Sequence, residues 1–243
     1  MIYKITQGLK ILLFTTAIFS LSPNDGFAQA DPIKTSALAV ISSIQVYKDA
    51  ALKDSNQRMV NLRTIIPDVV LDLRYGSVNN FMKRVMYTEK PTYSFMRLPA
   101  ARALALVQAD LHKKGLGLKI YDAYRPYFVT VKFWELVHDE RYVADPKKGS
   151  GHNRGIAVDL TIIDMRTKKE IHMPTGWDNF TDSAHHDFMN LSEEVLKNRQ
   201  LLKETMEKYG FVEFATEWWH YSLPEPEKYD VLDIPFHELK NAQ

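Results

Sequence analysis

Histidine and carboxylate side chains occur close together in one short stretch, residues 150–161. The second half of this stretch alternates between apolar residues and small or polar ones, which is typical of a strand with one face toward a core. Gly155 lies between His152 and the strand, as expected where the backbone turns tightly. Such a turn would bring the His152 imidazole beside the Asp159 carboxylate. Both groups are ligands that zinc binds in proteins, so the stretch predicts part of a metal site.

A third candidate ligand, His220, lies in the sequence Glu-Trp-Trp-His-Tyr at residues 217–221. Catalytic zinc typically keeps three protein ligands and leaves one position for water. His152, Asp159 and His220 would supply the three ligands, and Glu217 would act as the general base. Residues three apart on a regular strand point to opposite faces. We therefore expect a bulge or bend near Glu217 that lets it share a site with His220.

The first thirty residues have the pattern of a secretory signal peptide. Lys4 and Lys10 precede an apolar run over 11–21, and Ala-Gln-Ala at 28–30 provides a small-residue cleavage site. The apolar run is too short for an ordinary membrane span, although an uncleaved membrane anchor is the alternative interpretation. The sequence therefore predicts secretion across the inner membrane and a periplasmic protein with no membrane span in its mature chain.

The composition restricts the possible partners. The chain has 243 residues with a net charge of +1, and removal of residues 1–30 takes away two Lys and one Asp, which leaves zero. Zero net charge argues against nucleic acid or an anionic membrane as the main partner. There is no Cys, so neither a disulfide nor lipid attachment at a Cys is possible. The mature length fits one domain with one core, and its oligomeric state is not readable from the sequence.

Helices and strands are mixed without regular alternation, which predicts an α+β domain with a mainly antiparallel sheet and helices packed to one side. We expect an N-terminal helical leader at 31–58 and a catalytic domain at 59–243. Strands are predicted at 69–75, 117–121, 156–161, 211–214 and 218–223, and helices at 98–114, 126–138 and 193–209. A long loop at 174–186 is typical of a functional segment. The charged, proline-containing tail beyond Pro224 is expected at the surface.

The residues described above resemble a superfamily of zinc peptidases that act on D-alanine-containing peptides. The pattern Ser-x-His-x-x-Gly-x-Ala-x-Asp, followed by Glu-x-x-His, is similar to that of D-alanyl-D-alanine carboxypeptidases and dipeptidases. The dipeptidases, including the vancomycin-resistance dipeptidase, are the closer match. The supporting pieces are Tyr75 with Asn80-Phe81, Asp122-Ala123-Tyr124-Arg125-Pro126, Trp177 to Phe180 with Ser183 to His186, Asn198-Arg199 and Glu217 to Tyr221.

The resemblance implies one Zn²⁺ per chain, held by His152, Asp159 and His220, with Glu217 as the catalytic base. It also implies that Arg125 stabilises the tetrahedral intermediate, and that Asp178 and Ser150 hold the free amino group of a dipeptide. The chain departs from the family pattern at Gly151, where a second Ser can occur, and at Trp177, where Phe is common. Trp177 could narrow the substrate pocket. The resemblance does not cover residues 31–58.

Several of these residues have a simpler interpretation. Arg125 could be only an ion-pair partner of Asp122, although its guanidinium is a fixed, permanently charged fork. Asp178 could be an exposed turn residue. His185 and His186 follow Asp178 in the same loop, and we favour roles other than metal ligation for both. Trp218 and Trp219 are expected to be packing residues, with Trp218 possible in the pocket wall.

The sequence therefore favours an exported zinc-dependent hydrolase that cleaves D-alanyl-D-alanine into two D-alanines. The alternative enzyme is a D,D-carboxypeptidase or endopeptidase that acts on peptidoglycan stem peptides and needs an open cleft. A third hypothesis is a non-catalytic, zinc-stabilised binding domain, since the Hedgehog signalling domain resembles this superfamily. The presence of Glu217 argues against the third hypothesis.

Overall fold

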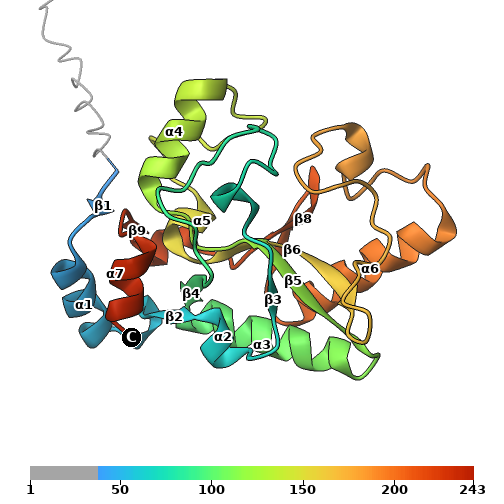
Figure 1. Cartoon of the computed structure of the whole chain (residues 1–243), viewed down its shortest axis with the longest axis horizontal. Helices are drawn as coiled ribbons and strands as arrows, with labels where there is room; N and C mark the ends of the chain where they lie inside the picture. The colour runs from blue at the N-terminus through green and yellow to red at the C-terminus, as the bar shows by residue number, and fades with distance from the viewer. Residues whose placement is uncertain (1–37) are drawn as a thin grey trace, which may run out of the picture. The chain divides into compact units, whose positions relative to one another are not determined.

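A five-stranded sheet lies at the centre of residues 38–243, the part of the chain that this computed structural model describes (Figure 1). β3 pairs parallel with β5, and the other neighbours pair antiparallel. In spatial order the strands are β3 (Val70–Leu71), β5 (Leu116–Asp122), β6 (Ala157–Asp164), β8 (Glu217–Ser222) and β7 (Val212–Phe214). The predicted signal peptide and residues 31–37 lie outside the described residues.

Two long helices pack against the sheet and against each other. α3 (Leu98–His112) contacts β5, and α6 (Glu193–Lys208) contacts β7 and β8. α3 begins with a proline in its first turn, where a missing N–H costs nothing, and Ser192 caps α6 by accepting from the Val195 N–H. A mainly antiparallel sheet with long helices packed on it confirms the predicted α+β class.

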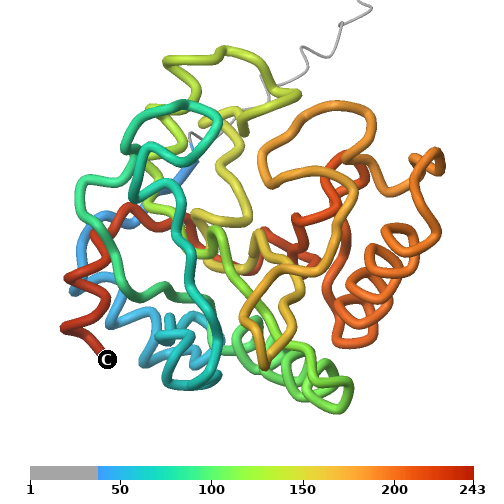
Figure 2. Tube along the Cα trace, turned by 45° about the vertical axis from the view of Figure 1, so that its right-hand side comes forward, coloured from blue at the N-terminus to red at the C-terminus, as the bar shows by residue number. Residues whose placement is uncertain are grey.

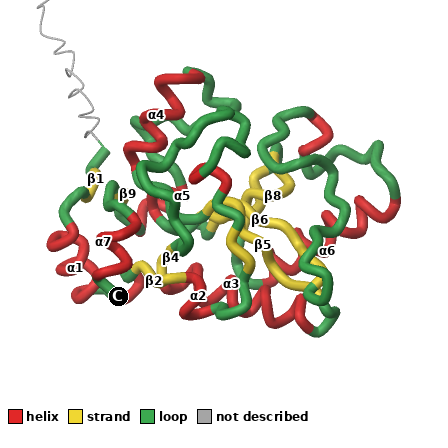
Figure 3. Tube along the Cα trace, in the orientation of Figure 1, coloured by secondary structure: helices red, strands yellow, loops and turns green. Residues whose placement is uncertain are grey.

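Loops and short helices form most of the opposite side of the sheet (Figure 3). α4 (Tyr127–Val137) and α5 (Gly151–Arg154) lie on this side. The loop over 138–150 connects them, and the loop over 174–186 follows β6. Both loops rise from the same side of the sheet, as the turned view shows (Figure 2). The helical face therefore supports the sheet, and the loop face is available for a site.

Short elements join the beginning and the end of the described chain. β1 (Val40–Ile41) pairs parallel with β9 (Val231–Leu232), and β2 (Met59–Asn61) pairs antiparallel with β4 (Phe95–Arg97). The further helices are α1 (Ile44–Lys53), α2 (Leu62–Ile65), α7 (Phe236–Asn241) and the 3-10 helices η1 (Ser55–Gln57), η2 (Arg74–Gly76), η3 (Asp182–Ala184) and η4 (Pro226–Lys228). No helix within 38–243 is both long and apolar enough to cross a membrane.

The C-terminal tail differs from the sequence prediction. It is not a surface segment beyond Pro224, because Ile234, Phe236 and Leu239 are buried in the core. The Tyr124 hydroxyl donates to the Ile234 carbonyl at 2.8 Å and accepts from the Ile234 N–H at 3.0 Å. The prediction gave weight to the charges and prolines, whereas the apolar residues between them are what pack against the aromatic core.

The predicted strand at 69–75 is also mostly wrong, since only Val70–Leu71 is strand. The Asp72 N–H still donates to the Ile120 carbonyl, after which the chain leaves the sheet and forms η2. Tyr75 is buried in this turn, and its carbonyl accepts from the N–H groups of Met86 and Tyr87. Burial of this large ring bends the chain inward and overrides the alternating pattern.

Candidate active site

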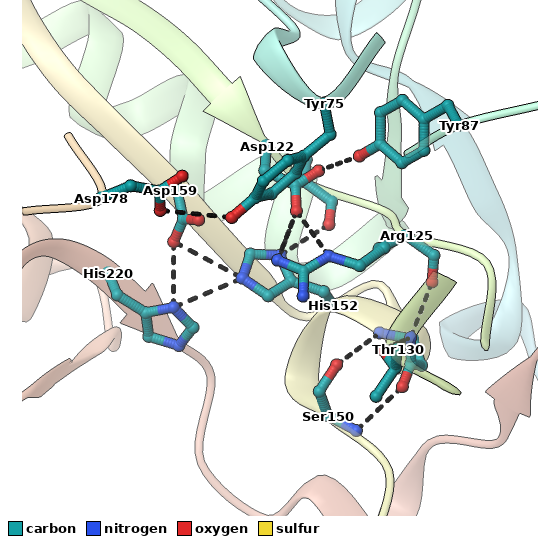
Figure 4. A network of polar contacts seen from close by, with 12 residues as sticks. Tyr75, Tyr87, Asp122, Arg125, Thr130, Ser150, His152, Asp159, Asp178 and His220 are labelled. Atoms are coloured by element: carbon teal, nitrogen blue, oxygen red, sulfur yellow. Dashed lines mark hydrogen bonds and ion pairs between the residues drawn. The ribbon is translucent and has the colours of Figure 1, made fainter. Parts of the chain in front are cut away.

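Three side chains from separate elements meet above β6. Asp159 comes from β6, His220 comes from the neighbouring position on β8, and His152 comes from α5. His152 Nε2 lies 3.4 Å from Asp159 Oδ1 and 3.3 Å from His220 Nδ1, and the last two atoms are 2.9 Å apart (Figure 4). Ligands bound tetrahedrally to zinc at 2.0–2.1 Å are roughly 3.3 Å apart. The three side chains predicted as metal ligands therefore have the spacing that one ion requires.

Backbone contacts orient the first of these ligands. His152 Nδ1 lies 2.8 Å from the carbonyl oxygen of Ala123, and a carbonyl only accepts hydrogen bonds. Nδ1 therefore carries the proton, and the lone pair of Nε2 points toward His220 and Asp159. Gly155 ends α5 with φ of +72°, and a Cβ there would lie 2.7 Å from the side chain of Met59. The predicted tight turn is thus confirmed, and it returns the chain from His152 to β6.

Asp159 is buried and remains charged. Burial by itself raises the pKa of this carboxyl group, but the adjacent imidazoles of His152 and His220 outweigh burial and hold the pKa below its ordinary value. A deprotonated carboxylate beside two imidazole nitrogens is a donor set suited to a divalent cation. Among the described residues 38–243, His152, Asp159 and His220 form a group whose possible ligand atoms all lie within 4.8 Å of one another.

Arg125 is the ion-pair partner of Asp122 and also lies at the cavity. Its Nε and Nη2 donate to Asp122 Oδ2 at 2.9 and 2.7 Å, and its side chain also lines the cavity beside the metal-binding group. Asp122 has no exposed surface, and its other oxygen accepts from the Tyr87 hydroxyl. Burial lowers the pKa of Arg125, but Asp122 together with Tyr75, Tyr87 and Asp159 outweighs burial and raises it. The guanidinium is therefore permanently charged and held in one orientation.

The position of Glu217 depends on an irregular pairing of β7 with β8. Glu213 pairs with Tyr221, but Phe214 pairs with Glu217, so the register shifts between the two pairs. This confirms the predicted irregularity, and Glu217 Oε2 lies 3.9 Å from His220 Nδ1. Burial raises the pKa of Glu217 to about 7, with a further increase from Asp159 and opposing effects from His220 and Arg125. A carboxyl group with such a pKa can both accept and donate a proton near neutral pH.

Asp178 is not an exposed turn residue, because its side chain lines the same cavity. The Tyr75 hydroxyl donates to its Oδ1 at 3.2 Å, whereas its Oδ2 is buried without a hydrogen-bond partner. Burial raises the pKa of Asp178 well above the ordinary value, and the charges of Asp159 and Glu217 add to the increase. An unpartnered buried carboxylate oxygen leaves one hydrogen-bond acceptor free for a bound cation.

Ser150 lies at the start of α5 and also lines the cavity. Its hydroxyl accepts from the Asn153 N–H at 3.2 Å, and its own N–H donates to Asn153 Oδ1 at 3.0 Å, which forms a capping box. The Asn153 amide also donates to the Arg125 carbonyl at 2.9 Å. Through Asn153, which the sequence did not single out, the helix that carries His152 is tied to the segment that carries Arg125.

The cavity has a volume of about 210 Å³ and a largely aromatic wall. Trp219 lines it, whereas Trp218 is a buried packing residue, as expected, that donates to the Thr175 hydroxyl at 2.9 Å and does not line the cavity. Trp177 does not narrow the cavity either, because it packs behind Tyr75 with ring centroids 4.8 Å apart. The aromatic side chains of the wall are Tyr75, Phe81, Phe133, Tyr142, Phe180, Phe214 and Trp219. No local sequence signal distinguishes these rings from core residues.

The two histidines of the loop after Asp178 lie outside the metal-binding group. His186 Nδ1 is 3.3 Å from Glu213 Oε2, and its side chain is buried against the β7–β8 hairpin. His185 lies in the wall of a second cavity of about 360 Å³. The prediction that neither residue is a metal ligand agrees with these positions.

Comparison with known proteins gives the same family as the site residues. Residues 55–239 match a family model described as D-ala-D-ala dipeptidase. The chain is 33% identical to the D-alanyl-D-alanine dipeptidase of Escherichia coli (strain K12) over 178 residues, which cover 73% of this chain and 91% of the relative. It is 28% identical to the D-alanyl-D-alanine dipeptidase of Enterococcus faecium over 206 residues, with coverages of 72% and 96%.

Among solved structures, the likeness is weak. VanYB in complex with D-Alanine-D-Alanine has a TM-score of 0.37 and 15% identity, with 56% of this chain and 75% of that chain covered. The LdcB LD-carboxypeptidase has a TM-score of 0.36 and 19% identity, with coverages of 58% and 65%. These scores are too low to support an inference about this chain.

Proposed function

We propose that this chain, which belongs to the D-ala-D-ala dipeptidase family of peptidases, hydrolyses D-alanyl-D-alanine to two molecules of D-alanine. The relatives that carry this name match the chain over most of their length. The observation that carries the proposal is the convergence of His152, Asp159, His220, Glu217 and Arg125 on one small cavity. This set combines metal ligands, a base and a fixed positive charge, which peptide hydrolysis requires.

One Zn²⁺ per chain would be held by His152 Nε2, Asp159 Oδ1 and His220 Nδ1. The fit rests on the distances between these atoms and on the direction of the His152 lone pair. When bound there, zinc would polarise the scissile carbonyl and lower the pKa of a water ligand to about 7. His152 and His220 present neutral nitrogens and Asp159 a charged oxygen, so the protein supplies a donor set that leaves the ion a net positive charge.

Glu217 and Arg125 would carry out the remaining chemistry. Glu217 would take a proton from the attacking water and deliver it to the amine of the departing D-alanine. The raised pKa of Glu217 favours proton delivery to the amine, because a carboxyl group with a pKa near 7 binds and releases a proton with similar free energies at neutral pH. Arg125, held by Asp122, would face the oxygen on which negative charge develops.

Asp178 and Ser150 would hold the ammonium group of the free dipeptide. The buried Oδ2 of Asp178 has no partner, and a substrate ammonium would provide one. Ser150 contributes a hydroxyl whose oxygen already accepts from Asn153 and whose proton remains free to donate. Burial of an ammonium group is costly without a carboxylate, so this end of the cavity would favour a substrate with a free amine.

We also propose that residues 1–30 direct export and that the mature enzyme works in the periplasm. The support is the sequence pattern of a basic start, an apolar run and a small-residue cleavage site. An exported enzyme would meet dipeptides released from the cell wall, so recycling of D-alanine is the role we favour. N-terminal sequencing of the exported protein should begin at Asp31, and a sequence that retains Lys4 would contradict cleavage.

The choice between dipeptidase and D,D-carboxypeptidase is tested with two substrates. The zinc-loaded enzyme should release D-alanine from D-alanyl-D-alanine and should fail to do so from N-acetyl-D-alanyl-D-alanine, because acetylation removes the ammonium group. The matched control is the same measurement on the Glu217→Ala variant, which should be at least ~10²-fold slower on the free dipeptide. Rapid hydrolysis of the acetylated substrate would instead favour the carboxypeptidase.

A further inference from the structure

The active-site cavity shares a wall with the second, outer cavity of about 360 Å³. Residues on both sides of this wall come from three segments that are distant in sequence. The residues that line both cavities are Glu140, Arg141, Tyr142, Phe180 and Phe214. Because a catalytic centre faces only one of the two cavities, the wall decides how far a bound substrate can extend.

The contact between Tyr142 and Phe180 forms the part of the wall that joins the two loops. Their ring centroids lie 5.2 Å apart at an interplanar angle of 60°. Tyr142 belongs to the loop over 138–150 and Phe180 to the loop over 174–186, which rise from the same side of the sheet (Figure 2). A single edge-to-face contact of this kind is favourable but weak, so it can hold a loop closed and still allow the loop to open.

The two partners of this contact differ in how firmly they are held. Phe180 also packs on Phe81 and Trp219, with ring centroids 5.1 and 6.3 Å away, so it has support on several sides. The Tyr142 side chain is 38% exposed, and apart from Phe180 its ring contacts the Arg141 guanidinium, which lies 5.3 Å from the ring centroid. Removal of the Tyr142 ring would therefore open the wall without disturbing the core.

This contact lies near the end of the cavity where the proposed ammonium partner is found. Phe180 is two residues from Asp178, and Phe81 packs edge-to-face on Tyr75, the residue that donates to Asp178. A peptide that continues beyond the amine of the dipeptide would have to pass this region. The outer cavity beyond the wall is lined by charged groups of both signs, Glu140 and Asp182 together with Arg141.

We propose that the Tyr142–Phe180 contact is a gate that restricts the enzyme to free dipeptides, and that the outer cavity becomes a subsite for the preceding residue of a longer peptide when the gate is removed. This inference rests on the proposed function, because it assumes that the dipeptide amine lies at Asp178.

Binding to a non-hydrolysing background tests the gate separately from turnover. The zinc-loaded Glu217→Gln variant is titrated with D-alanyl-D-alanine and with L-lysyl-D-alanyl-D-alanine, with and without Tyr142→Ala. We expect Tyr142→Ala to tighten tripeptide binding by at least about tenfold and to change dipeptide binding by less. The matched control is Tyr142→Phe, which keeps the ring and should bind both peptides as the background does.

Equal tripeptide affinity with and without Tyr142→Ala would overturn the gate proposal. An equal gain in tripeptide affinity from Tyr142→Phe would also overturn it. Tripeptide binding that already equals dipeptide binding in the background would also overturn it, because the wall would then be open. The proposed function is judged from a different measurement, the turnover of free dipeptide by the unmodified enzyme.

Discussion

Two buried arginines, Arg125 and Arg97, show that burial of a charge has different consequences in different surroundings. Arg125 pairs with the Asp122 carboxylate and faces the active-site cavity. Arg97 has no exposed surface and donates only to backbone carbonyls, those of Arg154 at 2.8 Å, Asp230 at 2.7 Å and Gln57. Burial lowers the pKa of Arg97 to about 10, whereas Asp122 and the other groups around Arg125 together outweigh burial and raise the pKa of Arg125.

The difference shows what each arginine does. The carbonyls bound by Arg97 come from the N-terminal part of the described chain, from the end of α5 and from the C-terminal tail, so Arg97 connects three distant segments. Its donors are all directed at the protein itself. The Arg125 region instead gathers several charges around a space that a substrate can occupy. A buried charge is therefore a functional signal when it faces a cavity, and a structural one when its donors are satisfied by backbone.

The strongest test of this comparison is removal of the base from the Arg125 region. Glu217→Gln keeps the shape of the side chain but cannot accept a proton, so kcat on D-alanyl-D-alanine should fall by about 10²–10⁴-fold. Zinc content, measured by atomic absorption, should stay at one per chain because no ligand is changed. A kcat close to that of the unmodified enzyme would remove Glu217 from the mechanism.

The second test changes the active-site arginine while keeping its positive charge. Arg125→Lys loses the planar fork that binds Asp122 at the edge of the cavity, and we expect kcat to fall by about 10²–10³-fold. The exposed Arg102 on α3 provides the matched control, since Arg102→Lys should leave kcat unchanged. If Arg125→Lys shifts the unfolding midpoint but spares kcat, Arg125 is only the ion-pair partner of Asp122.

The third test examines the structural arginine. Arg97→Met removes the donor of three backbone carbonyls and the charge of a fully buried side chain, and we expect the free energy of unfolding to fall on the order of 3–5 kcal/mol in urea titrations. In the protein that remains folded, kcat should change far less than in Arg125→Lys. Arg58→Met, at an exposed neighbouring position, is the control for the loss of one positive charge. A large loss of kcat without a loss of stability would contradict the comparison.

The smallest expected effect concerns the stability of the metal-free protein. Because burial raises the pKa of Glu217 from 4.5 to about 7, the folded state binds this proton more tightly than the unfolded state does. Its stability should therefore fall as the pH rises from about 4.5 to about 7, and the whole penalty should be present above pH 7. In the presence of a chelator, Glu217→Gln should raise the unfolding free energy by on the order of 1–3 kcal/mol at pH 8, and should have little effect at pH 4.5. An equal change in the unfolding free energy at the two pH values would show that the buried Glu217 charge does not destabilise the folded protein.

Most of the central elements could be predicted from local sequence patterns. The alternation at 156–161 predicted β6, and the proline, the apolar spacing and the glycine after residue 114 predicted α3. The prediction was wrong at 69–75 and beyond Pro224, where single large apolar side chains enter the core. Such burial depends on partners that are distant in the chain, and no local pattern records them.

The site was predicted in part. The sequence identified side chains that could bind a metal, because histidine and carboxylate at these positions are chemically unusual. It expected both Trp218 and Trp219 to be packing residues and considered only Trp218 for the cavity wall, whereas Trp219 lines the cavity beside the register shift of β7 and β8. It also missed Asn153 and Tyr142, whose side chains are ordinary and whose importance comes only from what they contact.

By itself, the sequence determined the chemical types at the centre of this protein, the periodicity of its main strands and helices, and its resemblance to a peptidase family. Only the tertiary structure decided which lone pair of His152 is free, which partner fixes the charge of Arg125, and where the cavity ends. The reason is physical: residue type and spacing follow from the chain itself, whereas distances, burial and pKa values arise from segments that meet only after folding.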